Sequence, residues 1–209
     1  MGFSQALLLW YHKNKRDLPF RKTKDPYRIW LSEIILQQTR VIQGLPYYER
    51  LVKLFPTVHQ LAKAREGAVM KAWQGLGYYS RARNLHQTAK HISRVFKGKF
   101  PQEYEEIKKL KGIGDYTAGA IASMAFNKPN VVVDGNVFRV LARFFGIRIP
   151  IDSAEGKKRF RKKAEELLDK KNPGTFNQAI MEFGALQCVP VNPNCGKCPL
   201  KTGCIAFIK

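Results

Sequence analysis

The sequence predicts an almost purely helical protein, and three observations support this fold class. Apolar residues recur at three- and four-residue spacing in almost every segment, as one face of a helix requires. Glycine and proline separate several of these segments, for example Gly75, Gly98 and Pro101. The strand-like run at 131–133 is too short to make a sheet. The 209 residues suffice for one large domain or two small ones with a buried core.

The expected helices follow one another along the chain. Asp25 and Pro26 are typical of a helix start, because Asp can accept a bond from a free backbone N–H and Pro tolerates the first helical position. Pro46 indicates the start of a later segment that Pro56 ends. From their periodicity we expect helical segments at 3–13, 29–42, 47–55, 58–73, 81–96, 103–110, 116–126, 137–146, 157–170 and 176–186.

The charge balance indicates a polyanionic partner. Thirty-seven Lys and Arg against sixteen Asp and Glu give a net charge of +21. Nucleic acid is the commonest polyanion in a cytoplasm, although a merely soluble basic surface is the alternative. The basic residues are spread from Lys13 to Lys201, which favours a binding face on a folded body over a disordered arm.

The sequence predicts a cytoplasmic protein. No apolar stretch approaches the roughly 20 residues that are needed to cross a bilayer. The N-terminal stretch lacks the basic start, apolar core and cleavage site of a signal peptide, and it suits a short amphipathic helix better. We therefore expect no contact with a membrane.

The four cysteines lie close together near the C-terminus, with the spacing C-x6-C-x2-C-x5-C. They are Cys188, Cys195, Cys198 and Cys204. Crowded thiols in a chain without secretory features favour metal binding, with disulfides as the alternative. Zinc and a [4Fe–4S] cluster both accept four thiolates. Zinc sites usually pair two short C-x2-C knuckles and this chain has one, so the spacing favours iron–sulfur.

The stretch LKGIGDYTAGAI predicts a helix, a glycine turn and a second helix. Gly112 and Gly114 have no Cβ, so a phosphate can approach the backbone N–H groups closely. The positive end of the second helix points the same way. The turn is therefore a candidate anchor for DNA phosphate, and an ordinary helix–helix corner is the alternative.

Two carboxylates are candidates for chemistry. Asp134 follows an apolar run and precedes a helix, so it can be a simple N-cap or an anion that faces a developing cation. Glu33 has Ile29, Trp30 and Gln37 on its helical face, and a carboxyl beside apolar groups tends to keep its proton, as a general acid must. An exposed, idle Glu is the alternative. Together with a DNA anchor, the pair suggests one proton donor and one permanent anion.

These features resemble a known family. The glycine hairpin, an Asp some 20 residues later and the cysteine spacing resemble the endonuclease III superfamily of helix-hairpin-helix DNA glycosylases. The stretches LSEIILQQTRV, GLGYYSRARNLH, VDGNVFRVLAR and FNQAIMEFGA closely resemble its adenine DNA glycosylase (MutY) branch. The resemblance runs from RDLPFR at 16–21 through Cys204.

The resemblance implies an all-α architecture of two helical modules with a DNA-binding cleft between them. A six-helix module would cover 23–131 and carry the helix-hairpin-helix at about 104–125. Residues 1–22 would join 132–209 in an iron–sulfur cluster module, with the cluster loop at 188–204. The implied protein is a nucleoid-associated monomer with a [4Fe–4S] cluster. Its implied substrate is double-stranded DNA with adenine mispaired with 8-oxoguanine or guanine.

The resemblance also implies roles for particular residues. Glu33 would protonate the flipped adenine, and Asp134 would stabilise the sugar cation, with Asn136 and Tyr116 orienting the two carboxylates. Lyase-active members have a lysine where this chain has Tyr116, and a phenol cannot form their Schiff base, so we expect an intact abasic site without strong lyase activity. The residues implied to contact DNA or the adenine pocket are Arg16, Arg21, Gln38, Thr39, Leu76, Tyr78, Gly112, Gly114 and Gln178.

Two departures from the pattern and two other functions stay open. Phe20 replaces the usual Trp of the RDLP motif but keeps an aromatic wall. The chain stops five residues after Cys204, where family members continue into an 8-oxoguanine-reading domain, so we expect a catalytic core with reduced selectivity for the partner base. The alternatives are a thymine-mismatch or oxidised-pyrimidine glycosylase on the same scaffold, and a non-catalytic or redox-sensing iron–sulfur protein that binds DNA.

Overall fold

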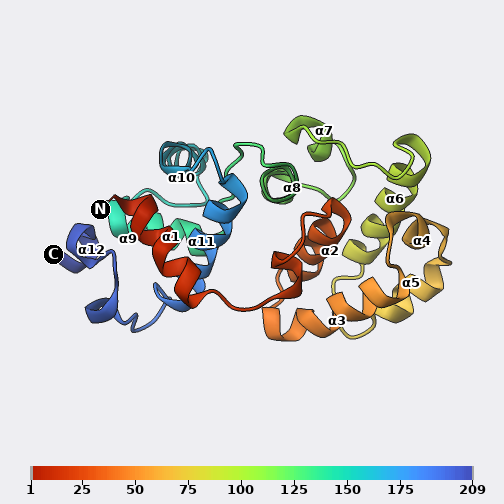
Figure 1. Cartoon of the computed structure of the whole chain (residues 1–209), viewed down its shortest axis with the longest axis horizontal. Helices are drawn as coiled ribbons and strands as arrows, with labels where there is room; N and C mark the ends of the chain where they lie inside the picture. The colour runs from red at the N-terminus through yellow and green to blue at the C-terminus, as the bar shows by residue number, and fades with distance from the viewer. Residues whose placement is uncertain (1, 209) are drawn as a thin grey trace. The chain divides into compact units, whose positions relative to one another are not determined.

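The computed structural model describes residues 2–208, and in this range every regular element is a helix (Figure 1). The prediction of an all-α fold is confirmed. The chain divides into two compact units. Unit 1 joins the N-terminal stretch that ends at Asp17 to the stretch that begins at Asn127, and unit 2 is the continuous segment Leu18–Phe126. These boundaries lie a few residues before those expected for the two modules.

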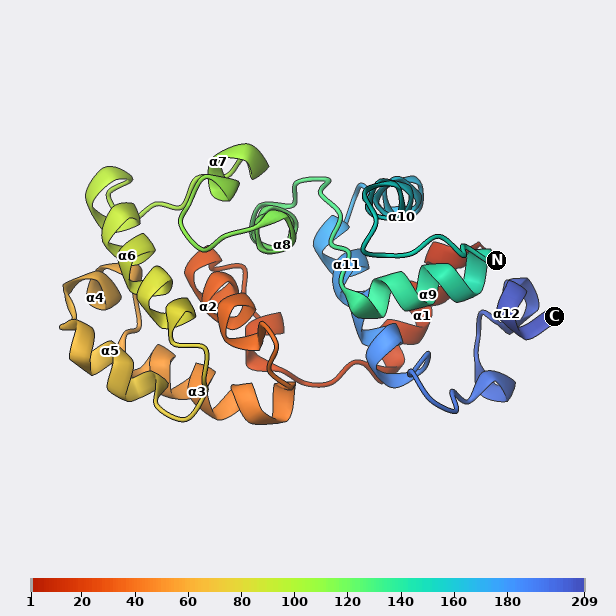
Figure 2. The same cartoon turned by 180° about the vertical axis from the view of Figure 1, so that it is seen from behind.

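Unit 2 is built around two apolar helices that pack on each other, α2 (Pro26–Leu36) and α8 (Asp115–Phe126). In α8, every residue from Thr117 to Met124 is buried, as expected of a helix that is covered on all sides. Of the other elements, η1 (Pro19–Arg21), α3 (Val41–Leu54) and α6 (Ser80–Val95) pack on α2, and α7 (Tyr104–Lys108) packs on α8 (Figures 1 and 2). The remaining helices, α4 (Val58–Lys63) and α5 (Glu66–Trp73), pack on α6.

The structure corrects three helix boundaries in unit 2. The helix expected at 29–42 ends at Leu36, because the chain turns at Gln38, whose φ is +55°. The next helix, α3, begins at Val41 and contains Pro46, which was expected to start it.

The helix expected at 58–73 is two helices, α4 and α5, separated at Ala64 and Arg65. The buried ring of His86 on α6 lies near the backbone of Ala62 and Ala64, where α4 ends, and its Nε2 has no hydrogen-bond partner among the described residues. Burial is the main reason why the pKa of His86 is lowered. Helical periodicity alone cannot reveal the break between α4 and α5.

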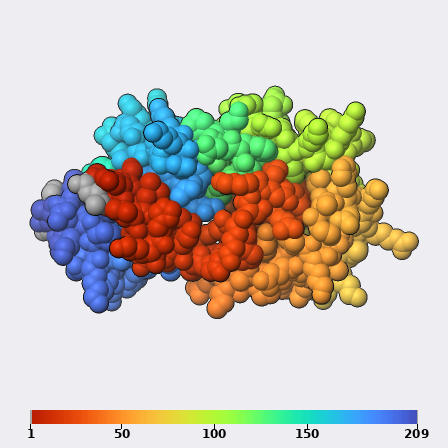
Figure 3. Space-filling model, viewed as in Figure 1, coloured from red at the N-terminus to blue at the C-terminus, as the bar shows by residue number. Residues whose placement is uncertain are grey.

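Unit 1 brings the two ends of the chain together. Its elements are α1 (Phe3–Asn14), α9 (Gly135–Phe145), α10 (Ala154–Leu167), α11 (Pro173–Leu186), η2 (Cys195–Lys197), η3 (Lys201–Gly203) and α12 (Ile205–Ile208). The N-terminal helix α1, red in Figure 3, lies beside C-terminal segments drawn in blue. It packs on α11, which in turn packs on α9. Leu7, Leu141, Phe176 and Phe183 are among the side chains of the shared core.

In the described range, no helix is both long enough and apolar enough to span a membrane.

Candidate functional site

The glycine hairpin lies between α7 and α8, as the sequence predicted. Gly112 has a φ of +78°, and a Cβ there would lie 2.8 Å from the Cβ of Asn84 on α6, so both the turn and the close approach require glycine. A Cβ on Gly114 would meet no atom within 4 Å, so the backbone at this position is open to an approaching ligand. The Gly114 carbonyl accepts the N–H of Ala118 and begins the bonding pattern of α8.

A carboxylate holds the two helices of the hairpin together. Asp115, in the first turn of α8, accepts a hydrogen bond from the Tyr104 hydroxyl on α7. It also pairs with the ammonium group of Lys108 at 2.6 Å. On the other side, the Thr88 hydroxyl of α6 donates to the Lys111 carbonyl at 2.8 Å. The turn is thereby fixed before any ligand binds.

Four residues expected to contact DNA gather around one side chain that the sequence reasoning missed, Arg81 of α6. The Arg81 guanidinium donates to the carbonyls of Ile34, Ile35 and Gln37, which the end of α2 leaves without helical partners. It thereby fixes the turn after α2. Thr39 and Tyr78 lie near the guanidinium, and Gln38 and Leu76 are next in the chain to Gln37 and Gly77, whose carbonyls accept from it.

The four residues differ in exposure. Thr39 lies within 3.5 Å of the guanidinium, between hydroxyl and nitrogen, and Leu76 is buried. The Tyr78 ring lies 5.5 Å from the guanidinium carbon, while 63% of the residue stays exposed. Gln38 and Tyr78 both adopt a positive φ, at +55° and +47°. Such strained, exposed positions are typical of binding segments.

A small cavity of about 40 Å³ links Arg81 to the hairpin. Its lining includes Trp30, Arg81 and Gly112. The indole N–H of Trp30 and the Nε–H of Arg81 are buried and have no acceptor among the described residues. The volume suits one or two ordered waters, which could accept from both donors.

Glu33 and Tyr116 lie on the two helices that pack at the centre of unit 2. Glu33 is partly buried on α2, one turn before Gln37. Tyr116 is partly buried in the first turn of α8, next to Thr117. The Gln37 amide donates to the Thr117 hydroxyl at 3.3 Å and so joins the two helices at this level.

In unit 1, Asp134 is the N-cap of α9. One carboxylate oxygen accepts the Val137 N–H at 2.8 Å, and the other accepts the Asn136 side-chain amide at 2.9 Å. The sequence left capping and catalysis as alternatives, and the geometry allows both, since each oxygen keeps further lone pairs.

Asn136 continues this network toward the cysteine loop. Its side-chain oxygen accepts from Arg139 at 2.7 Å, and Arg139 also donates to the carbonyls of Gly184, at 2.7 Å, and Cys188, at 2.8 Å. A hydrogen-bonded path therefore runs from the Asp134 carboxylate to the backbone of the first cysteine. The sequence reasoning missed Arg139, which appeared only as a letter inside VDGNVFRVLAR.

The residues expected to line the adenine pocket have partners inside unit 1. Arg16 forms two bonds with the buried carboxylate of Glu182 on α11, and this hydrogen bond is the main reason why the pKa of Arg16 is raised. Gln178, one turn earlier on α11, accepts from the Tyr11 hydroxyl at 2.9 Å. Arg21 belongs to η1 of unit 2. Glu182 was also missed, although a charged residue within an apolar run usually has a buried partner.

The four cysteines are free thiols, and each is partly buried. Burial is the main cause that raises the pKa of Cys198, and the charges of Cys188, Cys195 and Cys204 raise it further, so the four thiols are near neighbours. Among the described residues, no three His, Cys, Asp or Glu side chains are placed to hold a single metal ion. The donor set is that of a four-thiolate site, which suits zinc or an iron–sulfur cluster.

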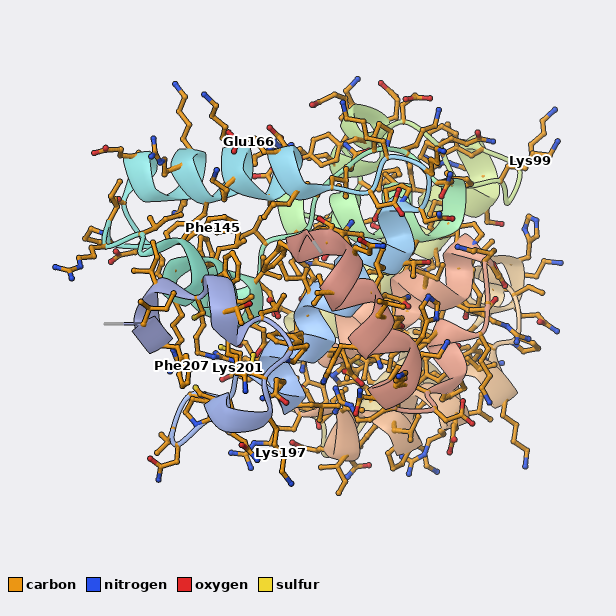
Figure 4. All side chains as sticks on the ribbon, turned by 60° about the vertical axis from the view of Figure 1, so that its left-hand side comes forward. Lys99, Phe145, Glu166, Lys197, Lys201 and Phe207 are labelled. Atoms are coloured by element: carbon orange, nitrogen blue, oxygen red, sulfur yellow. The ribbon has the colours of Figure 1, made fainter. Side chains whose placement is uncertain are left out.

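The predicted site residues therefore fall into one group in each unit. Unit 2 contains Glu33, Tyr116, the hairpin and the residues around Arg81. Unit 1 contains Asp134, Asn136, Gln178 and the cysteines. Figure 4 labels two lysines of the cysteine loop, Lys197 and Lys201.

The fold and these two groups define a helical protein of the helix-hairpin-helix class, with a strong positive charge and a candidate catalytic carboxylate on each unit. Residues 31–170 match the model of the HhH-GPD superfamily base excision DNA repair proteins, and the chain belongs to this family. The family resemblance expected from the sequence is confirmed.

Similar proteins support this assignment. The chain is 43% identical over 207 residues to an adenine DNA glycosylase of Buchnera aphidicola subsp. Baizongia pistaciae, covering 99% of this chain and 58% of the relative. It is 41% identical to an adenine DNA glycosylase of Homo sapiens, covering 98% of this chain and 39% of the relative. The chain thus spans little more than half the length of the first relative and less of the second.

Among solved structures, a thermostable thymine-DNA glycosylase has a TM-score of 0.90 and 28% identity, over 99% of this chain and 95% of that one. A non-covalent endonuclease III–DNA complex shares the fold, with a TM-score of 0.82 and 21% identity, over 98% of this chain and 93% of that one.

Proposed function

We propose that this chain is a monofunctional DNA glycosylase that removes adenine paired with 8-oxoguanine or guanine in duplex DNA. The observation that carries the proposal is the 43% identity to an adenine DNA glycosylase over almost the whole chain. The net charge of +21 and the open backbone at Gly114 support duplex DNA as the partner. On this proposal the protein acts as a cytoplasmic, nucleoid-associated monomer.

The proposed chemistry uses one carboxyl group from each unit. Adenine leaves the base stack at a cost of a few kcal/mol. Glu33 donates a proton to N7 of the flipped adenine, so that the base departs as a neutral molecule with the electron pair of the broken glycosidic bond. Acid catalysis of this kind contributes roughly 10²–10⁴-fold. Asp134 stabilises the positive charge that develops on the sugar, and water then adds to C1′ and loses a proton.

The contacts of Asp134 suit this role. The Val137 N–H and the Asn136 amide hold its two oxygens in fixed positions, so the carboxylate is oriented before positive charge develops on the sugar. Arg139 holds Asn136 in turn. Asn136 and Arg139 are therefore positioning residues for Asp134.

Tyr116 determines the type of product, and the residues around Arg81 would contact the bases. The phenol of Tyr116 cannot attack the sugar as an amine would, so the product is an intact abasic site without strong lyase activity. The exposed ring of Tyr78 is placed to stack on a base, which is worth about 1–3 kcal/mol. Gln38 and Thr39 lie beside it and would contact the base left without its partner.

A [4Fe–4S] cluster held by Cys188, Cys195, Cys198 and Cys204 is part of the proposal. Four neighbouring cysteines support it, and their C-x6-C-x2-C-x5-C spacing favours the cluster over zinc. When bound, the cluster would brace the loop that carries Lys197 and Lys201 against DNA phosphates. Metal analysis of the purified protein should find about four iron atoms and four acid-labile sulfides per chain. One zinc atom without sulfide would contradict the assignment.

Single-turnover excision assays test the proposed substrate. Duplexes carry adenine opposite 8-oxoguanine, guanine or thymine, with matched duplexes that carry thymine opposite guanine. We expect release of adenine opposite 8-oxoguanine and guanine, with strand cleavage only after alkali. Cleavage without alkali and a borohydride-trapped adduct would contradict the monofunctional assignment.

The same assay decides the second candidate. The likeness to a thermostable thymine-DNA glycosylase, with a TM-score of 0.90, favours thymine excision as the alternative. Release of thymine opposite guanine, with adenine untouched, would replace the proposed substrate by that alternative.

A further inference from the structure

Helix α10 is held to unit 1 by one face. Gly156, Phe160 and Ala164, spaced four residues apart, are buried. The Phe160 ring packs edge-on against Phe138 of α9, with 5.0 Å between the ring centres. The opposite side of α10 faces solvent.

That exposed side carries the α10 basic face, which we define as Lys158, Arg159 and Lys162. In the part of the chain that the structure describes, none of the three forms an ion pair. The acids of the last turn pair elsewhere, Glu165 with Arg161 and Glu166 with Lys163. The α10 basic face thus has no direct ion pair, although the charges of Arg159 and Lys162 also act on Glu166 and lower its pKa.

The like charges of the α10 basic face repel one another. Lys158 and Lys162 are four residues apart and Arg159 and Lys162 are three apart, so like charges lie side by side, which destabilises a helix. Glu155 precedes Arg159 by four residues and Glu166 follows Lys162 by four, which offsets part of this repulsion. The last turn has no basic residue and two acids, Glu165 and Glu166, which is the reverse of what the helix dipole favours.

The α10 basic face lies apart from the cysteine loop. In Figure 4, α10, marked by Glu166, runs along the upper side of unit 1, while Lys197 lies at the lower edge and Lys201 between them. A phosphate bound at the loop therefore leaves α10 uncovered.

We propose that the α10 basic face is a second, sequence-independent contact for the phosphates of duplex DNA, able to engage a duplex while the cysteine loop engages another segment. Charge complementarity supports DNA as the occupant, in a chain that belongs to a DNA repair family. Residues four apart rise about 6 Å along a helix, and a DNA strand presents a phosphate every 3.4 Å of its axis. Flexible lysine side chains can therefore reach neighbouring phosphates. The inference does not depend on which base the protein excises.

The test uses the full chain and an undamaged duplex. The variant carries Lys158→Gln, Arg159→Gln and Lys162→Gln. The matched control carries Lys53→Gln, Lys63→Gln and Lys71→Gln, three exposed lysines of unit 2, so both variants lower the net charge from +21 to +18. Each lost phosphate contact reduces the slope of log affinity against log salt by about 0.9, so we expect a reduction of about 2–3 in the α10 variant and below 1 in the control.

A second measurement follows transfer between duplexes. The dissociation rate of a labelled duplex should rise with the concentration of unlabelled duplex for the wild type and the control, and stay constant for the α10 variant. The α10 variant should unfold at the same or a higher temperature, because like-charge repulsion is removed. An unchanged salt slope and unchanged transfer would overturn the proposal. Salt-sensitive binding of polyglutamate, lost in the α10 variant while DNA binding is unaffected, would assign the face to an acidic protein instead.

Discussion

Arg81 organises the candidate DNA-contacting turns of unit 2. Its guanidinium satisfies carbonyls at the end of α2, and its charge lies near the rings of Trp73, at 5.3 Å, and Tyr78, at 5.5 Å. Only arginine offers several donors in a rigid plane that can serve all these groups together. One buried side chain therefore determines where α2 ends and where the exposed ring of Tyr78 lies.

Replacing Arg81 with Leu should destabilise the protein by about 3 kcal/mol, because buried carbonyls lose a charged donor. Arg83→Leu, on the exposed side of the same helix, is the matched control. Its contact with Glu66 spans 3.8 Å and is open to solvent, so we expect a change below about 1 kcal/mol. Denaturant unfolding measures both variants. Equal stability of the two would show that Arg81 does not hold the turn after α2.

At the scale of elements, α9 joins the candidate catalytic carboxylate to the cysteine loop. Asp134 caps its first turn, Arg139 reaches the Cys188 carbonyl, and Arg143 donates to the carbonyls of Val189, at 2.7 Å, and Pro190, at 2.8 Å. Helix α9 is therefore hydrogen-bonded both to the Asp134 carboxylate at its start and to the backbone of the cysteine loop. Its close packing on α11 sets the position of Asn136.

Gly184 of α11 makes that packing possible, since a Cβ there would lie 2.6 Å from the Asn136 Cβ and 2.9 Å from its carbonyl oxygen. Gly184→Ala should therefore cost about 1–3 kcal/mol of stability and slow excision, because Asn136 must move. Gly67→Ala is the control: a Cβ there meets nothing within 4 Å, and alanine favours the helix by up to about 1 kcal/mol. Thermal unfolding and single-turnover rates test the pair. An unchanged excision rate in the Gly184→Ala variant would show that the position of Asn136 does not affect the reaction.

Sequence patterns predicted the elements better than their ends. Long amphipathic segments such as 81–96 and 157–170 became helices because their apolar stripe has a core to pack on. The break after Leu36 could not be predicted, since it depends on Arg81, which reaches it from another helix, and no local pattern marked the break after Lys63. Pro46 also misled, since α3 continues through it although a proline inside a helix removes one i→i−4 hydrogen bond.

The sequence predicted which residues belong to the candidate site, but it did not predict the hydrogen bonds that connect them. Motif spacing picked out the hairpin glycines, the cysteines and the two carboxylates. Arg139 and Glu182 escaped because their importance lies in long-range contacts, to Cys188 and Arg16, that no local pattern encodes. The roles of Glu33 and Asp134 stay predictions.

At the scale of the whole molecule, each of the two units carries one candidate catalytic carboxyl group. Unit 2 holds Glu33 on its central helix, and unit 1 holds Asp134 at the start of α9. If both groups act on one nucleotide, removing either should disable the same reaction. The two substitutions should then not be additive.

Single-turnover excision of adenine opposite 8-oxoguanine by Glu33→Gln, Asp134→Asn and the double variant measures this directly. Asn is as good an N-cap as Asp, so the second substitution removes charge without unfolding α9. We predict a loss of at least about 10²-fold for each single variant, a double variant hardly slower than the slower single variant, and nearly unchanged duplex binding in all three. A single variant that excises adenine at the wild-type rate would contradict the account.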